Sequence, residues 1–194
     1  MTILKYSLAD FTNDMESLLR GQPDQQQLFD RGSSYLERLI ANPQPIPPQF
    51  QQPTGVGSRP NHGSYLLYQG ESGLQVTAVV WGARDHLGPH DHMTWGMIGI
   101  MGEGLTETRY RRIDDHRKPG YAKLEQARSA NCKPGEITLL IPEVDEIHQM
   151  DNFTDRPTVE IHVYGHDLRG LDRHAFDLKT GRVIDFATQK YDNC

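Results

Sequence analysis

The sequence has few cysteines and no long hydrophobic run. Its two cysteines, Cys132 just before a Pro-Gly turn and Cys194, are too few and too poorly placed for a disulfide framework. No segment reaches about 18 continuous apolar residues, and the first residues lack a basic stretch followed by an apolar run. We therefore expect a soluble cytoplasmic protein with no membrane partner.

An excess of positive charge is also missing. The chain has 20 Lys and Arg against 26 Asp and Glu, a formal net charge of -6. Because nucleic-acid binding needs a basic surface to neutralise phosphates, this balance argues against a nucleic-acid partner. One basic cluster, interrupted by Asp114 and Asp115, consists of Arg109, Arg111, Arg112, Arg117 and Lys118. We interpret it as a solvated strand end and turn.

The first 53 residues are predicted to form a helical arm. Residues 8–20 repeat apolar side chains at three- and four-residue steps up to Gly21, and residues 24–41 do so after Asp24, a candidate N-cap. Two amphipathic helices are therefore expected. The proline-rich residues 43–53 cannot continue a helix or lie in a central strand, which predicts an extended connector. We expect residues 1–53 to pack on a barrel formed by the remainder.

Residues 54–194 have the pattern of an all-β domain. Short apolar or alternating runs are separated by Gly, Pro and Asp, and closure into a barrel would protect the strand edges. The predicted strands are SYLLYQ, LQVTAVVWG, TWGMIGIM, LTETRYRR, EITLLI, TVEIHVYG, RHAFDL and RVIDFA, in chain order. The predicted fold is an all-β barrel with a helical N-terminal arm.

The segment PHDHMTWG, residues 89–96, contains the first candidate metal ligands. If His90 and His92 lie on one strand, their side chains project from the same face, with Cα atoms about 6.6 Å apart. Two imidazoles at that spacing can converge on one ion. The alternative is a pair of structural histidines, which an isolated H-x-H motif leaves equally open.

A second histidine motif lies downstream, in EITLLIPEVDEIHQMDN. His148 follows the turn at Pro134 and Gly135, and Asn152 is the fourth residue after it. A turn, a strand with a histidine and a following Asn, downstream of an H-x-H strand, resembles the two-motif signature of the cupin superfamily. In cupins the two motifs face each other inside a small barrel and supply metal ligands. The resemblance implies that His90, His92 and His148 share one ion.

The usual cupin glutamate ligand is missing here. Gly96 and Met97 occupy the places four and five residues beyond His92, and Glu103 and Glu107 are expected past the following turn. Three neutral imidazoles leave the ion's positive charge uncompensated. Such a site should favour an anionic ligand such as a thiolate or an oxyanion.

The strand TVEIHVYG alternates strictly, and two interpretations of it are open. In one, its aliphatic side chains face the core while Glu160, His162 and Tyr164 face water. In the other, those three polar side chains line the barrel interior beside the metal. Pattern alone slightly favours the first.

The motifs together resemble the thiol dioxygenases of the cysteine dioxygenase type I family. They are PHDHMTWG, LTET, PGEI, HQMDN, EIHVYG and LDRHAFD, spread between about Tyr65 and Tyr191, and the helical arm fits as well. The sequence is most similar to the bacterial 3-mercaptopropionate dioxygenases, notably in HDHxxWG, IHVYG and RHxFD. The resemblance implies a cupin with a three-histidine Fe(II) site that uses O2 to oxidise a small thiol to its sulfinate.

The resemblance also implies roles for residues around the metal. Gly96 stands where cysteine dioxygenases carry a cysteine cross-linked to the tyrosine that Tyr164 matches, so this cross-link cannot form. His162 and Tyr164 match the outer-sphere pair. Arg173 matches an arginine proposed to hold the substrate carboxylate, and its planar fork of donors suits that task. Trp95, within HDHxxWG, is a further candidate for substrate binding.

Two departures leave the substrate open. Glu160 replaces the family's outer-sphere serine, and Gly63 or Ser64 stands where a carboxylate-recognising Arg or Gln is expected. We count Ser64 as a candidate substrate contact. Glu160 could bind a substrate ammonium, pair with an arginine or accept a proton, and we count it with Tyr164 and His162 as catalytic.

Three functions remain as alternatives. The first is an Fe(II) thiol dioxygenase acting on a 3-mercaptopropionate-like mercaptocarboxylate or cysteine, with the thiol and O2 as its small-molecule partners. The second is another metal-dependent cupin enzyme, either a carbon-centred dioxygenase or an isomerase. The third is a non-catalytic ligand-binding cupin. The oligomeric state is open, with a homo-oligomer as one alternative.

Overall fold

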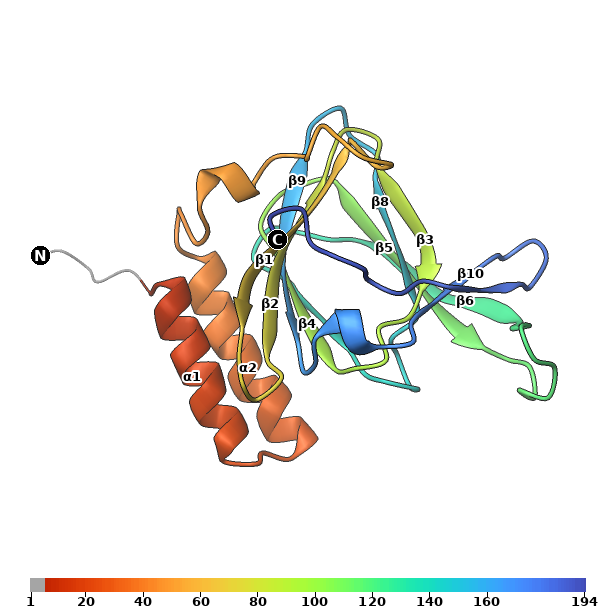
Figure 1. The fold of residues 1–194 in the computed structure, drawn as a ribbon, viewed down its shortest axis with the longest axis horizontal. Coiled ribbons are helices and arrows are strands. Elements are labelled where there is room, and N and C mark those ends of the chain that lie inside the picture. Colours follow the sequence, from red (N-terminus) through yellow and green to blue (C-terminus); the bar gives the residue numbers. More distant parts are fainter. Residues whose placement is uncertain (1–5) are drawn as a thin grey trace, which may run out of the picture.

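A computed structural model describes residues 6–194 as two helices packed against a two-sheet barrel (Figure 1). Helix α1 runs from Leu8–Arg20 and α2 from Gln25–Ile40. Ser7 and Asp10 form a capping box at the start of α1, and the Asp24 side chain accepts from Gln27 N at the start of α2. Both predicted helices are confirmed. No helix in residues 6–194 is long and apolar enough to cross a membrane.

The connector after α2 is not extended throughout, as residues 43–53 were expected to be. Pro48–Phe50 form a short 3-10 helix, η1. Proline fixes φ near the helical value, and this allows it to start such a turn although it cannot continue an α-helix. The expectation that this segment avoids α-helix and central strand is confirmed.

The barrel consists of two antiparallel sheets. One has the strand order β1-β2-β9-β4-β7 and the other β11-β10-β3-β8-β5-β6. The bounds are β1 His62–Gln69, β2 Gln75–Trp81, β3 His86–His90, β4 Gly96–Ile100, β5 Leu105–Arg112, β6 Leu124–Asn131, β7 Ile137–Leu140, β8 His148–Asn152, β9 Thr158–Tyr164, β10 His174–Phe176 and β11 Val183–Asp185. A second 3-10 helix, η2, spans Leu168–Gly170. The predicted all-β fold with a helical N-terminal arm is confirmed.

All eight predicted strand segments contain an observed strand, but the hydrophobic pattern misses three strands. Two of them, β3 and β8, carry histidines of the two motifs, and the third is β6. Its sequence LEQARSAN is polar, and nearly all of its residues are exposed at the edge of the second sheet. An edge strand that buries neither face needs no hydrophobic alternation, so periodicity cannot identify it.

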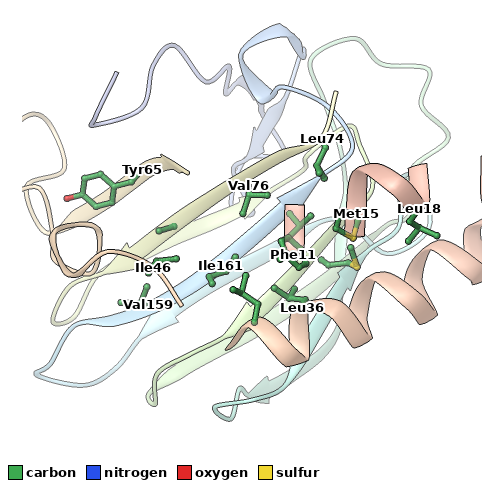
Figure 2. Packing of buried hydrophobic residues seen from close by; sticks show 14 of the residues in the cluster. Phe11, Met15, Leu18, Leu36, Ile46, Tyr65, Leu74, Val76, Val159 and Ile161 are labelled. Atoms are coloured by element: carbon green, nitrogen blue, oxygen red, sulfur yellow. The ribbon is translucent and has the colours of Figure 1, made fainter. Parts of the chain in front are cut away.

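Strand β9 is buried on both faces, which decides between the two interpretations of its alternating pattern. Val159, Ile161 and Val163 belong to the hydrophobic cluster that also contains Phe11 and Leu36 of the helices. Figure 2 shows Ile161 and Val159 on the same side of the sheet as these helical residues. The helical arm therefore covers the aliphatic face of β9, and the polar face points into the barrel.

The basic cluster is not solvated throughout. Arg109 on β5 is 1% exposed, and its Nη2 lies 2.8 Å from Glu107 Oε1. Its Nη1 also donates to the Asp145 carbonyl at 2.7 Å. The prediction of a solvated strand end is wrong for Arg109, because β5 directs this side chain inward where a buried carboxylate compensates its charge.

The helix-sheet cluster predicts a specific stability effect. Leu36 is fully buried between α2 and β4, so Leu36→Ala should lower the free energy of unfolding by about 2–5 kcal/mol. Leu178→Ala is the matched control, because Leu178 is 53% exposed and should change stability by less than about 0.5 kcal/mol. Urea denaturation monitored by circular dichroism measures both. Equal effects would show that the arm contributes little to the core.

Candidate metal centre

Three histidine side chains converge inside the barrel. His90 ends β3 and His148 begins β8, and the two residues are direct partners in the β3-β8 ladder. The ring centroid of His90 lies 4.9 Å from that of His92 and 4.7 Å from that of His148. All three side chains are buried, and one ring nitrogen of each lies within 4.8 Å of the others. The structure thus brings together the predicted metal ligands.

His92 is not on the same strand as His90. Strand β3 ends at His90, and the chain then turns, with Met93 at φ 57. One carboxylate oxygen of the buried Glu146 accepts from the backbone N–H groups of His92 at 3.2 Å and Met93 at 2.9 Å. This anchored turn, rather than strand alternation, brings the His92 ring back beside the other two.

The hydrogen bonds of the rings set which nitrogens face the shared space. His90 Nδ1 lies 2.9 Å from the Gly88 carbonyl, and His148 Nδ1 lies 2.8 Å from Glu107 Oε1. Because a carbonyl and a carboxylate accept hydrogen bonds, both rings carry their proton on Nδ1 and present Nε2 as a lone pair. This is the second-sphere arrangement typical of metal-binding histidines.

The nitrogen spacing fits an octahedral ion. His92 Nε2 and His148 Nε2 are 3.0 Å apart. Two donors about 2.1 Å from one ion and at right angles to each other would be about 3.0 Å apart. His92 Nδ1 is buried and has no hydrogen-bond partner among the described residues, so no protein hydrogen bond sets the tautomer of this ring. The three histidines therefore fit a divalent metal ion with several ligand positions left free.

All three imidazoles are held in the neutral form. Burial lowers the pKa of His90 and His92 well below the usual value, and the neighbouring positive charge of Arg173 lowers it further. Burial also lowers the pKa of His148, although Glu107 opposes the shift. Neutral imidazole is the form that coordinates metals, so no proton has to leave these ligands at neutral pH.

Glu107 has a role that the sequence analysis did not assign to it. It lies past the turn, as expected, on β5, which pairs with β8. Burial alone would raise its pKa, but the contacts with His148 and Arg109 lower it to about 2. Glu107 therefore stays ionised and orients His148. The alternation of LTETRYRR, which puts Leu105, Glu107 and Arg109 on one face, is a signal that could have revealed this inward carboxylate.

A cavity of about 230 Å³ opens on the three histidines. Its lining includes four of the other predicted site residues, namely Ser64, His162, Tyr164 and Arg173. Trp95 and Glu160 are not part of the lining. Trp95 instead packs beside the cluster shared with the helices, against Gly165, whose Cβ position would be 2.2 Å from the indole nitrogen.

A hydrogen-bonded chain along β9 runs from the cavity into the protein. The Tyr164 hydroxyl lies 2.6 Å from His162 Nδ1, and His162 Nε2 lies 2.9 Å from Glu160 Oε2. The same Glu160 oxygen accepts from Trp81 Nε1 at 2.6 Å. Because a carboxylate accepts from Nε2–H, His162 Nδ1 is left to accept the proton of the Tyr164 hydroxyl. Glu160 therefore fixes the tautomer of His162 from outside the cavity.

Tyr164 is placed close to the metal ligands by a glycine. Its ring stacks on His92 with centroids 5.2 Å apart. A Cβ on Gly96 would lie 3.1 Å from Tyr164 Cδ1 and 2.9 Å from Leu140 Cδ1, so a larger residue there would require the Tyr164 ring or the Leu140 side chain to shift. Burial raises the pKa of Tyr164 strongly, which keeps its hydroxyl protonated.

Arg173 is a buried cation whose hydrogen bonds go to neutral groups. Its Nε donates to the Asp91 carbonyl at 3.1 Å and its Nη1 to Thr188 Oγ1 at 2.8 Å. The guanidinium also lies over the Phe186 ring, 5.0 Å from its centroid. Burial lowers the pKa of Arg173 from its very high ordinary value. Facing the cavity without a carboxylate bonded to it, this guanidinium is suited to bind an anionic ligand group.

The second-sphere carboxylate gives a prediction about metal affinity. Glu107→Gln should weaken metal binding about 10–100-fold, because the amide no longer favours a proton on His148 Nδ1. Glu103→Gln is the control, since Glu103 is exposed and should leave the affinity unchanged. Metal content after dialysis and titration with a chelator measure the effect, and His148→Ala gives the value for a lost ligand. An unchanged affinity in Glu107→Gln would remove Glu107 from the site.

Comparisons with known proteins find only distant similarities. No family model matches this sequence. Among solved structures, an oxalate oxidase in complex with the substrate analogue glycolate is 13% identical, with a TM-score of 0.45 over 61% of this chain and 57% of its own. A Schizosaccharomyces pombe cupin domain is 12% identical, with a TM-score of 0.40 over 55% and 66%. A Bordetella pertussis cupin domain is 17% identical, with a TM-score of 0.37 over 56% of this chain and 97% of its own.

The chain thus matches little more than half of the oxalate oxidase, and these similarities concern the fold alone. The architecture is a barrel of two antiparallel sheets with a buried histidine triad that could bind a metal.

Proposed function

We propose that the protein is a non-haem Fe(II) dioxygenase that converts a small thiol and O2 into the corresponding sulfinate. The observation that supports this most is the donor set: three neutral imidazoles, with neither a carboxylate nor a thiolate among them, at the wall of a cavity that also contains Arg173. When bound, Fe(II) would supply coordination for a thiolate and activation of O2. Because the three imidazoles are neutral, they would leave the positive charge of the ion for an anionic sulfur ligand to balance.

Arg173 would bind and orient the substrate. It lies two residues before Ala175, which is the ladder partner of His90, and it lines the same cavity as the three histidines. The hydrogen bonds to Asp91 and Thr188 fix the guanidinium group, and a substrate carboxylate would accept from its remaining N–H groups. Holding the carboxylate places the sulfur of a short mercaptocarboxylate toward the three histidines. Fixing the reactants in this way can lower a barrier by roughly 7–11 kcal/mol at best.

Tyr164, His162 and Glu160 would manage protons at the edge of the cavity. The Tyr164 hydroxyl donates to His162 Nδ1, so its oxygen is free to accept a hydrogen bond from a group in the cavity. A proton taken up at Tyr164 Oη can be passed to His162 Nδ1, while Glu160 stabilises the protonated ring from the other side. Glu160 thus acts through His162 and does not contact the substrate.

The segment after β11 would limit access of water to the site. Phe186 packs edge-on against His90 with centroids 5.5 Å apart, and residues 186–191 line the cavity. The segment is fastened further on, where Asp192 N donates to the Ser64 carbonyl at 2.8 Å and Ser64 N donates to the Asp192 carboxylate at 2.7 Å. Excluding water from the site would limit side reactions and strengthen the hydrogen bonds inside it.

Oxygen uptake tests the reaction. Fe(II)-loaded protein should consume one O2 per thiol and form the sulfinate, with both oxygen atoms from O2, when offered a panel of mercaptocarboxylates and cysteine. An oxygen electrode and mass spectrometry with labelled O2 measure this. Ligand binding without O2 uptake would favour a binding protein, and a product oxidised at carbon would favour another metal-dependent cupin enzyme.

The proton relay predicts a selective kinetic defect. Tyr164→Phe should lower kcat about 10²–10⁴-fold with little change in KM for the thiol, because the hydroxyl handles protons and does not hold the carboxylate. The matched control is Tyr68→Phe, whose hydroxyl contacts Glu16 at 3.2 Å, away from the barrel cavity. Steady-state kinetics compare the two variants. Wild-type kcat in Tyr164→Phe would exclude the hydroxyl from the reaction.

A further inference from the structure

The charged side chains that line the metal cavity all have the same sign. They are Arg59, Arg173 and Lys190, and no Asp or Glu of the described residues is part of the lining. This is notable in a chain whose 26 acidic residues outnumber its 20 basic ones. The charged groups that line the cavity are thus cationic although the protein as a whole is negative, which favours anionic ligands over cationic ones.

The nearest carboxylates are already used in ways that keep them out of the cavity. Glu160 is fully buried, and its Oε2 accepts from Trp81 and His162. Asp85 accepts from Arg59 Nη2 at 2.9 Å and lies 2.9 Å from His62 Nδ1. Glu160 Oε1 has no hydrogen-bond partner among the described residues, but neither Glu160 nor Asp85 is part of the cavity lining, so neither faces an ammonium group of a substrate. The ammonium-binding role considered for Glu160 therefore has no support in the geometry.

Arg59 still has donors available for a ligand. Asp85 and the His86 carbonyl take only its Nη2, and within residues 6–194 no hydrogen bond involves its Nε or Nη1. The side chain is 35% exposed, so it lies at the mouth of the cavity. The guanidinium is thus fixed by one nitrogen and presents the others, an arrangement suited to recognise an anion.

Arg59 and Arg173 are at different ends of the cavity. Arg173 lies near His90 at the end of β3, whereas Arg59 contacts His86 at the start of that strand. Four residues of strand separate these anchor points by about 13 Å. Exposed Lys190 adds a third positive charge to the lining. The guanidinium groups of Arg59 and Arg173 thus approach the cavity from opposite ends of β3.

We propose that the substrate is a thiol with at least two anionic groups and no cationic group, one anion held by Arg173 beside the histidines and the second by Arg59 at the mouth. This assignment rests on the proposed thiol oxidation for the identity of the reacting group, but its charge selectivity belongs to the cavity itself. Arg59 is then the residue that distinguishes a dianionic thiol from 3-mercaptopropionate. Zwitterionic or cationic thiols such as cysteine and cysteamine are disfavoured.

Ligand binding tests the charge selectivity without any reaction. Anaerobic calorimetry on Fe(II)-loaded protein would compare succinate, glutarate, adipate and pimelate with monocarboxylates of equal chain length. At least one dicarboxylate should bind 10-fold or more tightly than its matched monocarboxylate. Arg59→Gln should reduce this advantage to less than threefold, and Arg59→Lys should retain most of it. Arg84→Gln is the control, since exposed Arg84 pairs with Asp155 outside the cavity lining and should change nothing.

Oxidation of thiols separates this proposal from the proposed function. Mercaptosuccinate and longer dianionic thiols should include a substrate with at least 10-fold higher kcat/KM than 3-mercaptopropionate, and Arg59→Gln should remove the difference. If dicarboxylates bind through Arg59 but no thiol yields a sulfinate, the thiol dioxygenase function is wrong and the charge selectivity stands. If 3-mercaptopropionate, cysteine or cysteamine matches every dianionic thiol, and Arg59→Gln has no effect, the charge selectivity is wrong and the function stands.

Discussion

The burial of both faces of β9 is the constraint on which the rest of the structure depends. Its aliphatic residues share one buried cluster with apolar residues of the helices, so packing of the helical arm favours this orientation of the strand. Its alternate residues then have to point into the barrel, where Glu160, His162 and Tyr164 form one hydrogen-bonded chain. A one-residue shift of register would exchange the two faces, placing valines beside the histidines and a carboxylate against the helices. The hydrophobic effect on the outside of the sheet thus positions the polar groups inside.

The distribution of carboxylates explains how an acidic protein can have a cationic cavity. The inward carboxylates near the site do not line the cavity. Each of them instead holds a residue that does line it. Glu107 orients His148, Glu146 holds the turn that carries His92, and Asp85 holds Arg59. Burying such charges is costly unless they are paired, and here each has polar partners. The site therefore gains fixed geometry from acidic residues without exposing negative charge to a ligand.

Much of this arrangement could be predicted from the sequence, but the missing parts share a cause. The helices and the barrel follow from periodicity and turn residues, and the histidine triad follows from the resemblance of its two motifs to those of cupins. The inward position of Glu107 and Arg109 was not predicted because a charged side chain usually faces water, and only the pairing of β5 with β8 shows that these two compensate each other inside. The folding of His92 back toward His90 depends on Glu146, a residue far along the chain. Contacts between distant segments determine these features, and local patterns do not contain them.

The order of the strands has a consequence for synthesis of the protein on the ribosome. Helices α1 and α2 end at Arg20 and Ile40, but β9, which completes the cover of their apolar face, ends only at Tyr164. At a translation rate of roughly 5–20 residues per second, the nascent helices would wait on the order of 10 seconds for that partner. Exposed Phe11, Met15 and Leu36 would form a surface for chaperones or for aggregation during this interval. The yield of folded protein should therefore depend on how long this face stays uncovered, a kinetic quantity that the stability of the finished barrel does not determine.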